Sequence, residues 1–222
     1  MSVLTLGYPS TLGTGSRRCD PFDQIYGRTL EVTGADVTAG KVDAVVIWGG
    51  ADISPSLYGQ PASQMTHARA ELSSRDEIEA DIFHSAVSAG VPIIGVCRGA
   101  QLACALSGGK LVQHVGGHGG SHPITLSDGG SIVTTSVHHQ MMFPFDMPVD
   151  DWNLLAWTKD KLSASYVLTD DDIRQEIPCE PEIVWFPKTR ALAIQGHPEF
   201  DTEDSPFVQH CLDLVRKFIL GV

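Results

Sequence analysis

Cys97 lies in the segment whose residue types point most directly to chemistry. The sequence Gly95-Val-Cys97-Arg-Gly99 ends an apolar run and precedes a stretch rich in Ala and Leu. Glycines two residues to either side of a cysteine allow the tight strand-to-helix turn that projects a nucleophile. A sulfur at the start of a helix also lies beside backbone N–H groups that favour the thiolate. We predict an activated nucleophile at Cys97, whereas Cys104 has the commoner role of a small buried hydrophobic residue.

A thiolate nucleophile needs a base, and the base needs a group that orients it. His197 and Glu199 follow the apolar run 191–195 and are two residues apart. Extended backbone directs side chains at this spacing to the same side. Glu199 would then hold the imidazole of His197 in the tautomer that faces the sulfur. The pair is a weak signal alone and becomes specific only in combination with Cys97.

Paired glycines, Gly49 and Gly50, follow the apolar run 44–48. Such glycines let the backbone turn its N–H groups toward a ligand, as an oxyanion hole requires. The N–H of Gly50 and the N–H of Arg98, the residue after the cysteine, are the candidates for this hole. A plain turn between strand and helix would contain the same glycines, so that alternative stays open.

Three further histidines, His114, His118 and His122, recur every four residues, which is the spacing of a metal-binding helix face. Glycines between Gly116 and Gly120 argue against a helix there, and no set of carboxylate or cysteine ligands lies nearby in the sequence. We therefore expect no metal site, and no cofactor.

The elements that must position these residues alternate between strands and helices. Short runs rich in strand-forming residues predict strands at 3–6, 44–48, 92–96, 132–136, 153–157, 182–186 and 191–195. The early runs are almost wholly apolar, as are strands of parallel sheets covered on both faces. We predict an α/β fold with three layers: a mostly parallel open sheet with helices on both faces. In such folds the site lies at the carboxyl ends of the strands.

Two helices have clear sequence signals. Ser74 followed by Glu77 predicts a capping box, and Gly90 predicts the end of the same helix. Residues 205–220 have one apolar stripe at helical spacing and predict the last helix. The acidic and weakly patterned stretch 162–181 is expected to be a solvated excursion.

Composition limits the compartments and partners of the chain. Of its 222 residues, 42% are hydrophobic and 19% are charged, which is typical of a folded globular protein. A net charge of −12 disfavours binding to nucleic acid and to anionic membranes. The five cysteines form no CxxC pair, which favours a reducing cytoplasm over a disulfide framework. With no long apolar run and no leader, we expect one cytoplasmic domain over residues 1–222.

Taken in order, these motifs resemble the class I glutamine amidotransferase-like family, and within it the γ-glutamyl-γ-aminobutyrate hydrolase group of the γ-glutamyl hydrolase peptidases. The resemblance is carried by residues 48–59, 75–79, 95–101, 108–111, 135–140 and 197–199. It implies a flavodoxin-like fold. It also implies a catalytic triad and an oxyanion hole, made respectively by Cys97, His197 and Glu199, and by the amides of Gly50 and Arg98.

The resemblance further implies how a substrate is held and cleaved. Gln101 and the segment Ser136, Val137 and His138 would grip the α-amino and α-carboxylate ends of a glutamyl group. The implied reaction is hydrolysis of a small γ-glutamyl amide through a glutamyl thioester. The alternative is a glutaminase subunit that hydrolyses glutamine and delivers ammonia to a separate synthetase partner. Assembly of the chain into a homodimer is also compatible with these expectations.

Some features of the sequence leave the substrate assignment open. Thr135-Ser136, the stretch 181–185 and the glycines at 116–120 depart from the family pattern around the acceptor side of the pocket. They leave the triad intact and leave the amine half of the substrate undefined. Arg75, Asp76 and Glu79 could equally form a solvated first turn of a helix. A related fold that has lost its activity is the least favoured alternative, because all members of the triad are present.

Overall fold

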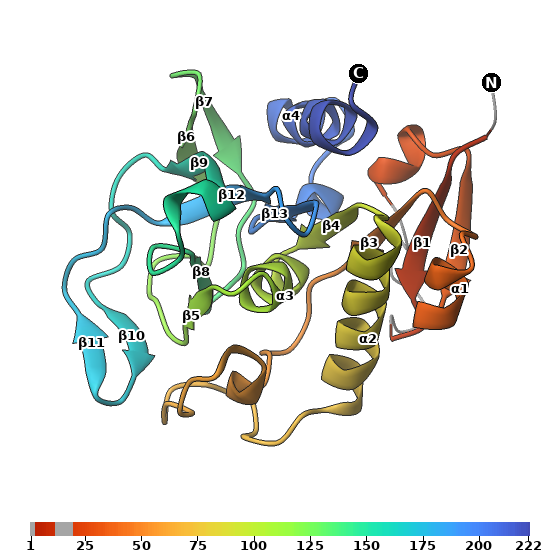
Figure 1. Ribbon diagram of the computed structural model, residues 1–222. Coiled ribbons are helices and arrows are strands. Elements are labelled where there is room, and N and C mark those ends of the chain that lie inside the picture. Colours follow the sequence, from red (N-terminus) through yellow and green to blue (C-terminus); the bar gives the residue numbers. More distant parts are fainter. Residues whose placement is uncertain (1–2, 12–19) are drawn as a thin grey trace.

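Nine strands form one open sheet within residues 3–11 and 20–222, the part of the chain that the computed structural model describes (Figure 1). The strand order is β2-β1-β3-β4-β13-β12-β9-β6-β7. The parallel part of the sheet contains β1 (Thr5–Pro9), β2 (Arg28–Val32), β3 (Ala44–Ile47), β4 (Ile93–Val96) and β13 (Ala191–Ile194). The sheet continues antiparallel through β12 (Pro181–Phe186), β9 (Asn153–Thr158), β6 (His122–Leu126) and β7 (Ser131–Thr134).

Two small sheets flank the large one. One pairs β5 (Lys110–Val112) with β8 (Met141–Phe143), and the other pairs β10 (Tyr166–Thr169) with β11 (Asp172–Arg174). Buried side chains of β5, β8 and β10 share a small hydrophobic cluster of their own. The strand β8 of this cluster begins at Met141, three residues after the substrate segment predicted at 136–138.

Helices cover both faces of the large sheet (Figure 1). On one face lie α1 (Gly34–Thr38), α2 (Ser74–Ala89) and α3 (Arg98–Leu106). The other face is covered by α4 (Pro206–Leu214), which continues as a π-helix over Val215–Leu220. Short 3-10 turns lie at Phe22–Gln24, Pro55–Tyr58, Val149–Asp151 and Pro198–Phe200. The predicted α/β fold with helices on both faces is therefore confirmed.

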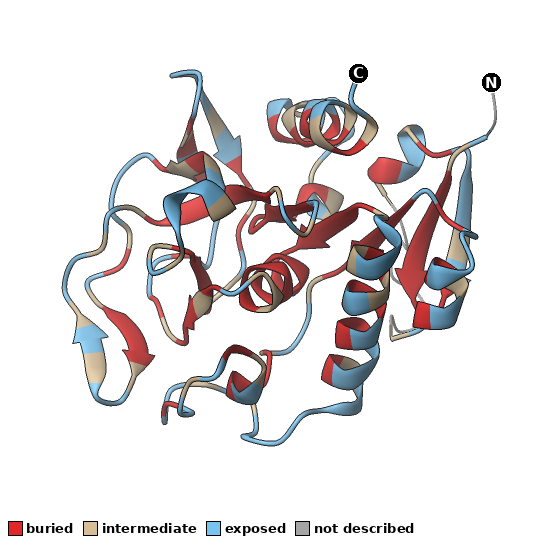
Figure 2. Cartoon of the chain, in the orientation of Figure 1, coloured by how far each residue is buried: buried red, intermediate tan, exposed pale blue. Residues whose placement is uncertain are grey.

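The core follows from alternation of side chains along the buried strands. In β3, Val45 and Ile47 pack with α2 and α3, while Ala44 and Val46 pack on the opposite side with α4. Adjacent residues of a strand point to opposite faces, so a strand covered on both faces needs apolar residues throughout. The central strands are accordingly buried along their whole length (Figure 2).

The long helix α2 differs from prediction by one residue at its start. Its N-cap is Ser73, whose side chain accepts from the N–H of Asp76, and the Asp76 carboxylate accepts from the backbone N–H of Ser73. The expected capping box of Ser74 and Glu77 is thus wrong, because the extended backbone that a cap requires occurs at Ser73. Gly90, with φ of 69°, ends the helix as predicted.

The stretch 162–181 is not the solvated excursion expected from its acidity. It contains the β10–β11 hairpin, and its Glu180 is buried. The carboxylate of Glu180 accepts hydrogen bonds from the hydroxyls of Thr158 and Tyr166 and from the N–H of Ser163. Ser163 and Tyr166 lie in the same stretch but 14 to 17 positions before Glu180, so the pairing is invisible to a local sequence pattern.

Two expectations from composition can be compared with the structure. Cys97, Cys104, Cys179 and Cys211 are free, and Cys19 lies outside the described residues. Among the described residues, no helix combines the length and apolar character needed to span a membrane.

Candidate active site

Cys97 occupies the tight turn between β4 and α3. Its φ of 51° and ψ of −105° lie in a region that L-residues rarely adopt. A Cβ on Gly95 would lie 2.4 Å from the carbonyl oxygen of Gly99, and a Cβ on Gly99 would lie 1.9 Å from that of Ile47. Both glycines are therefore required for the chain to turn so sharply against β3. The turn has the geometry of the predicted nucleophile elbow.

His197 and Glu199 follow β13, the parallel neighbour of β4. The Nδ1 of His197 donates to Oε1 of Glu199 over 2.7 Å. From a Cβ placed on Gly49, the Cε1 of His197 would lie 3.0 Å away and the Cβ of Cys97 3.5 Å away. The imidazole and the cysteine therefore meet over Gly49. The ring of Phe200 stacks on the imidazole, with centroids 4.5 Å apart.

The environment of His197 favours its protonated form. Burial alone would lower the pKa of this imidazole, but hydrogen bonds and charge interactions with Cys97 and Glu199 outweigh burial and raise the pKa to about 10. An imidazole with this pKa carries a proton at neutral pH and can give it to a leaving group.

Gly50 lies in the loop after β3, with φ of 151°. The Nη2 of Arg75 donates to the carbonyl oxygens of Trp48, over 3.1 Å, and of Gly49, over 2.9 Å. In a trans peptide the C=O and the following N–H point in opposite directions. Because Arg75 holds the Gly49 carbonyl, the N–H of Gly50 is directed away from the guanidinium.

A buried ionic network extends from Arg75 to the elbow. The Nε of Arg75 donates to Glu79, and the other oxygen of Glu79 accepts from the guanidinium of Arg98. Arg98 also donates to Asp76, the N3 residue of α2. Asp76, Glu79 and Arg98 are at most 1% exposed. The alternative of a solvated helix surface is therefore wrong for Asp76 and Glu79, and sequence analysis missed the role of Arg75.

Gln101 lies one turn into α3, directly above the elbow. Its backbone N–H donates to the carbonyl of Cys97, and its Nε2 donates to the carbonyl of Gln140 over 2.9 Å. The same carbonyl accepts from Nδ1 of His138 over 2.8 Å. The structure thus brings together Gln101 and His138, which the sequence assigned to one binding region.

Thr135, the residue before the predicted substrate segment, is hydrogen-bonded to His197. The backbone N–H of His197 donates to the carbonyl of Thr135 over 2.8 Å, and the hydroxyl of Ser136 donates to the carbonyl of His118 over 3.1 Å. Ser136 is buried, whereas Val137 is 59% exposed. The side chains of Gln101 and Ser136 therefore hold the segment in place, and Val137 is its outward-facing residue.

His118 and His122 lie together in the interior. The Nε2 of His122 is 2.8 Å from Glu182, and His118 is 3.4 Å from Glu180 and 3.5 Å from Glu182. The carboxylates that the local sequence lacks come from a distant segment, because β12 and the residue before it place Glu182 and Glu180 beside these histidines. Burial alone would raise the pKa of both carboxyl groups, but hydrogen bonds outweigh it and lower both to about 2.

The fold and the elbow define the class of protein. The fold is that of solved glutamine amidotransferase structures, and the chain aligns with the CTPS glutaminase domain of Trypanosoma brucei at a TM-score of 0.58. That alignment has 14% identity and covers 99% of this chain and 94% of that one. More particularly, the chain belongs to the Peptidase C26 family, whose sequence model matches residues 29–162.

Sequence similarity to curated proteins supports the same family. The chain is 30% identical over 178 residues to Rv2859c of Mycobacterium tuberculosis, a protein named as a glutamine amidotransferase, covering 74% of this chain and 53% of that protein. It is 29% identical over 133 residues to the carbamoyl phosphate synthase small chain of Pectobacterium atrosepticum, covering 58% and 30%. The chain therefore spans about half or less of the length of these relatives.

Proposed function

We propose that the protein is a cysteine hydrolase that cleaves the γ-glutamyl amide bond of small γ-glutamyl compounds. The observation that carries the proposal is the meeting of Cys97 and His197 over Gly49, with Glu199 holding the far side of the imidazole. In this proposal Cys97 is the nucleophile, His197 the general acid and base, and Glu199 the residue that orients the imidazole.

The first half of the reaction forms a thioester. The sulfur of Cys97 attacks the γ-carbonyl carbon, a C–S bond forms, and the carbonyl oxygen gains the negative charge. The N–H groups of Gly50 and Arg98 stabilise this oxyanion. Collapse of the intermediate breaks the C–N bond, and the proton on His197 passes to the departing amine nitrogen.

The second half releases glutamate. Neutral His197 takes a proton from water, and the resulting hydroxide attacks the thioester carbon. The C–S bond breaks and returns the thiolate of Cys97 beside the protonated imidazole. These steps use only side chains and backbone groups of the chain, so the proposal includes no cofactor.

The glutamyl end of the substrate would be held by the segment at 136–138. Ser136 and His138 are themselves hydrogen-bonded within the protein, and burial lowers the pKa of His138 to about 3, which keeps it neutral. Neutral His138 offers no charge for a substrate carboxylate. We therefore assign Gln101, Ser136 and His138 to shaping the segment, whose backbone and exposed Val137 would meet the substrate.

A second candidate is a glutaminase that supplies ammonia to a separate synthetase. It is favoured by the similarity to a carbamoyl phosphate synthase small chain and to a CTPS glutaminase domain. The same cysteine chemistry would then act on glutamine, with ammonia as the departing amine.

Release of glutamate from a panel of γ-glutamyl amides and from glutamine tests both candidates. Wild type should turn over at least one γ-glutamyl amine without a partner, Cys97→Ala should lose turnover by several orders of magnitude, and Cys104→Ala should retain it. Equal release by wild type and Cys97→Ala would exclude the thioester route. Hydrolysis of glutamine only after a synthetase is added would favour the second candidate.

A further inference from the structure

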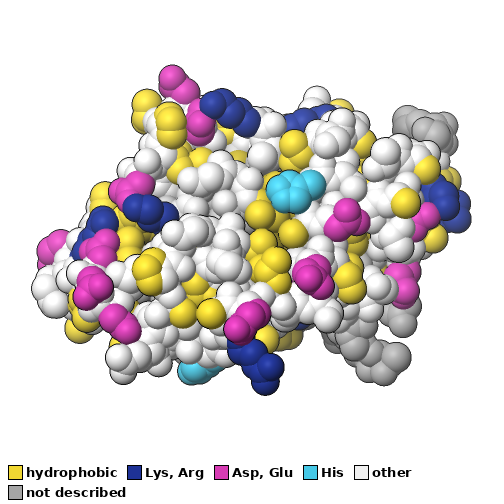
Figure 3. All heavy atoms as spheres, turned by 60° about the horizontal axis from the view of Figure 1, so that its bottom comes forward, with side chains coloured by type: hydrophobic (Ala, Val, Ile, Leu, Met, Phe, Trp, Pro, Cys, Tyr) yellow, Lys and Arg dark blue, Asp and Glu magenta, His cyan; other side chains and the backbone are white. Residues whose placement is uncertain are grey.

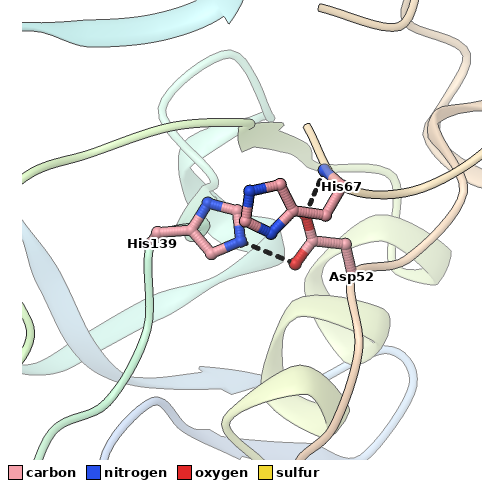
Figure 4. A group of neighbouring side chains, drawn as sticks. All are labelled: Asp52, His67 and His139. Atoms are coloured by element: carbon pink, nitrogen blue, oxygen red, sulfur yellow. Dashed lines mark hydrogen bonds and ion pairs between the residues drawn. The ribbon is translucent and has the colours of Figure 1, made fainter. Parts of the chain in front are cut away.

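Asp52, His67 and His139 form a cluster that the proposed reaction does not use (Figure 4). They come from three separate segments: the loop after β3, the loop before α2, and the end of the 135–140 segment. One ligand atom from each residue lies within 4.8 Å of the other two. The Nε2 of His139 is 2.9 Å from Oδ1 of Asp52. The rings of His67 and His139 lie against each other, with centroids 4.3 Å apart.

These distances suit a tetrahedral metal ion. Zinc binds His nitrogen and carboxylate oxygen at about 2.0–2.2 Å, which places neighbouring donor atoms roughly 3.4 Å apart. The 2.9 Å pair needs to open slightly, and the other two separations, which are at most 4.8 Å, need to shorten by no more than about 1.4 Å. His67 is exposed, so its side chain is free to rotate and make this adjustment.

The carboxylate of Asp52 is already oriented for a ligand. Its Oδ2 accepts from the backbone N–H of His67 over 2.8 Å and from the hydroxyl of Thr66 over 3.3 Å. Oδ1 is left to face His139. Supporting hydrogen bonds of this kind fix the direction of metal-binding carboxylates in proteins.

A third imidazole, that of His114, lies beside the cluster. The ring of His114 has its centroid 5.7 Å from that of His139. Its Nδ1 is buried and has no hydrogen-bond partner among the described residues. A buried nitrogen without a partner is costly, and an ion or an ordered water would satisfy it.

The cluster is also open to ions from solvent, unlike the interior group of His118, His122 and Glu182. That group is buried throughout, and its imidazoles already face the carboxylates of Glu180 and Glu182. In contrast, His67 of the proposed cluster is exposed. Asp and Glu side chains are scattered over the molecular face shown in Figure 3. The net charge of −12 raises the local concentration of cations around the protein.

We propose that Asp52, His67 and His139 bind a divalent transition-metal ion of the zinc type, with the remaining position taken by His114 or water. Binding would displace the proton shared between His139 and Asp52 and release it to solvent. Because Asp52 is two residues after Gly50 and His139 follows His138, a bound ion would tie the oxyanion loop to the substrate segment.

Titration calorimetry with Zn²⁺, and absorption spectra with Co²⁺ as a coloured substitute, test this site in the whole protein. His67→Ala should weaken binding at least about tenfold, whereas His84→Ala, which removes an exposed histidine of α2, should leave it unchanged. Zn²⁺ should raise the unfolding temperature of wild type and of His84→Ala more than that of His67→Ala.

The variant Cys97→Ala distinguishes Zn²⁺ binding at the proposed site from Zn²⁺ binding by the proposed triad. This variant should bind Zn²⁺ as wild type does. Loss of binding in Cys97→Ala, or full binding in His67→Ala, would overturn the proposal. Absence of binding at micromolar concentrations in wild type would overturn it as well. None of these readouts depends on turnover of a γ-glutamyl substrate.

Discussion

The guanidinium of Arg75 donates a hydrogen bond to the carbonyl oxygen of Gly49 over 2.9 Å. This contact fixes the peptide plane between Gly49 and Gly50, because the peptide bond is planar. The same guanidinium is anchored by Glu79, which also binds Arg98 beside the cysteine elbow. One buried network of α2 therefore orients both backbone segments that the proposed oxyanion hole uses. We propose that a hole held in this way is formed before substrate arrives.

Arg75→Met should lower kcat about 100-fold to 1000-fold while changing KM little, since it frees the Gly49 peptide to rotate and removes one oxyanion donor. Steady-state kinetics on the best γ-glutamyl amide measures the effect. Arg69→Met, which alters an exposed arginine, is the matched control. The role of Arg75 is refuted by unchanged kcat in a folded variant.

Glu199→Gln should shift the alkaline limb of the pH profile to lower pH. The pKa of His197 is held near 10 because hydrogen bonds and charge interactions with Cys97 and Glu199 outweigh the opposing effect of burial. Neutralising Glu199 removes part of the raising effect, so the imidazole loses its proton at a lower pH. The measurement is kcat/KM between neutral and alkaline pH. An alkaline limb that stays in place would contradict the assignment of Glu199 as the partner of His197.

Iodoacetamide should alkylate Cys97 before Cys104 or Cys179 at neutral pH. Burial raises the pKa of Cys104 to about 12 and that of Cys179 to about 11, so both remain thiols. His197→Ala should slow the reaction at Cys97, because it removes the adjacent cation. Peptide mass spectrometry over a time course gives the order of modification. Alkylation of Cys104 at the same rate as Cys97 would be inconsistent with an activated nucleophile.

Glu180→Gln should destabilise the fold at neutral pH by about 2–3 kcal/mol, the loss expected for hydrogen bonds to a buried charge. Despite burial, which acts in the opposite direction, hydrogen bonds from His118, Ser163 and Tyr166 lower the pKa of Glu180 from 4.5 to about 2. The stabilisation is therefore complete above about pH 4.5 and disappears as the pH falls toward 2. Urea unfolding at pH 7 and pH 3 measures it. Glu203→Gln, at an exposed carboxylate, should show no comparable loss.

The predictable part of the fold is the part that its local sequence determines. The apolar runs at 44–48, 92–96 and 191–195 predicted central strands because strands covered on both faces need such runs. The elbow at Cys97 was predictable because the turn excludes any side chain at Gly95 and Gly99. Both signals are visible in the types of a few adjacent residues, although Gly99 is required partly because its turn packs against Ile47 of β3.

The parts that sequence analysis missed depend on contacts between distant segments. Arg75 meets Gly49 across 26 positions, and Asp52 meets His139 across 87. Glu180 was predicted to be solvated because its donors lie 14 to 22 positions before it, beyond the reach of a local pattern. The start of α2 was misplaced for a different reason. Both Ser73 and Ser74 have an acidic residue three positions later, so the backbone rather than the local pattern decides which one caps the helix.

The unusual backbone conformation of Cys97 lowers the stability of the fold, and the reactivity of its sulfur is gained at that cost. Conformations of this kind cost about 1–3 kcal/mol for a residue with a side chain, and glycine is free of that penalty. Cys97→Gly is therefore expected to melt at a higher temperature than Cys97→Ala while being equally inactive. Without selection for activity, the more stable glycine would be favoured at this turn. Retention of the cysteine would therefore indicate continuing selection for its reactive sulfur.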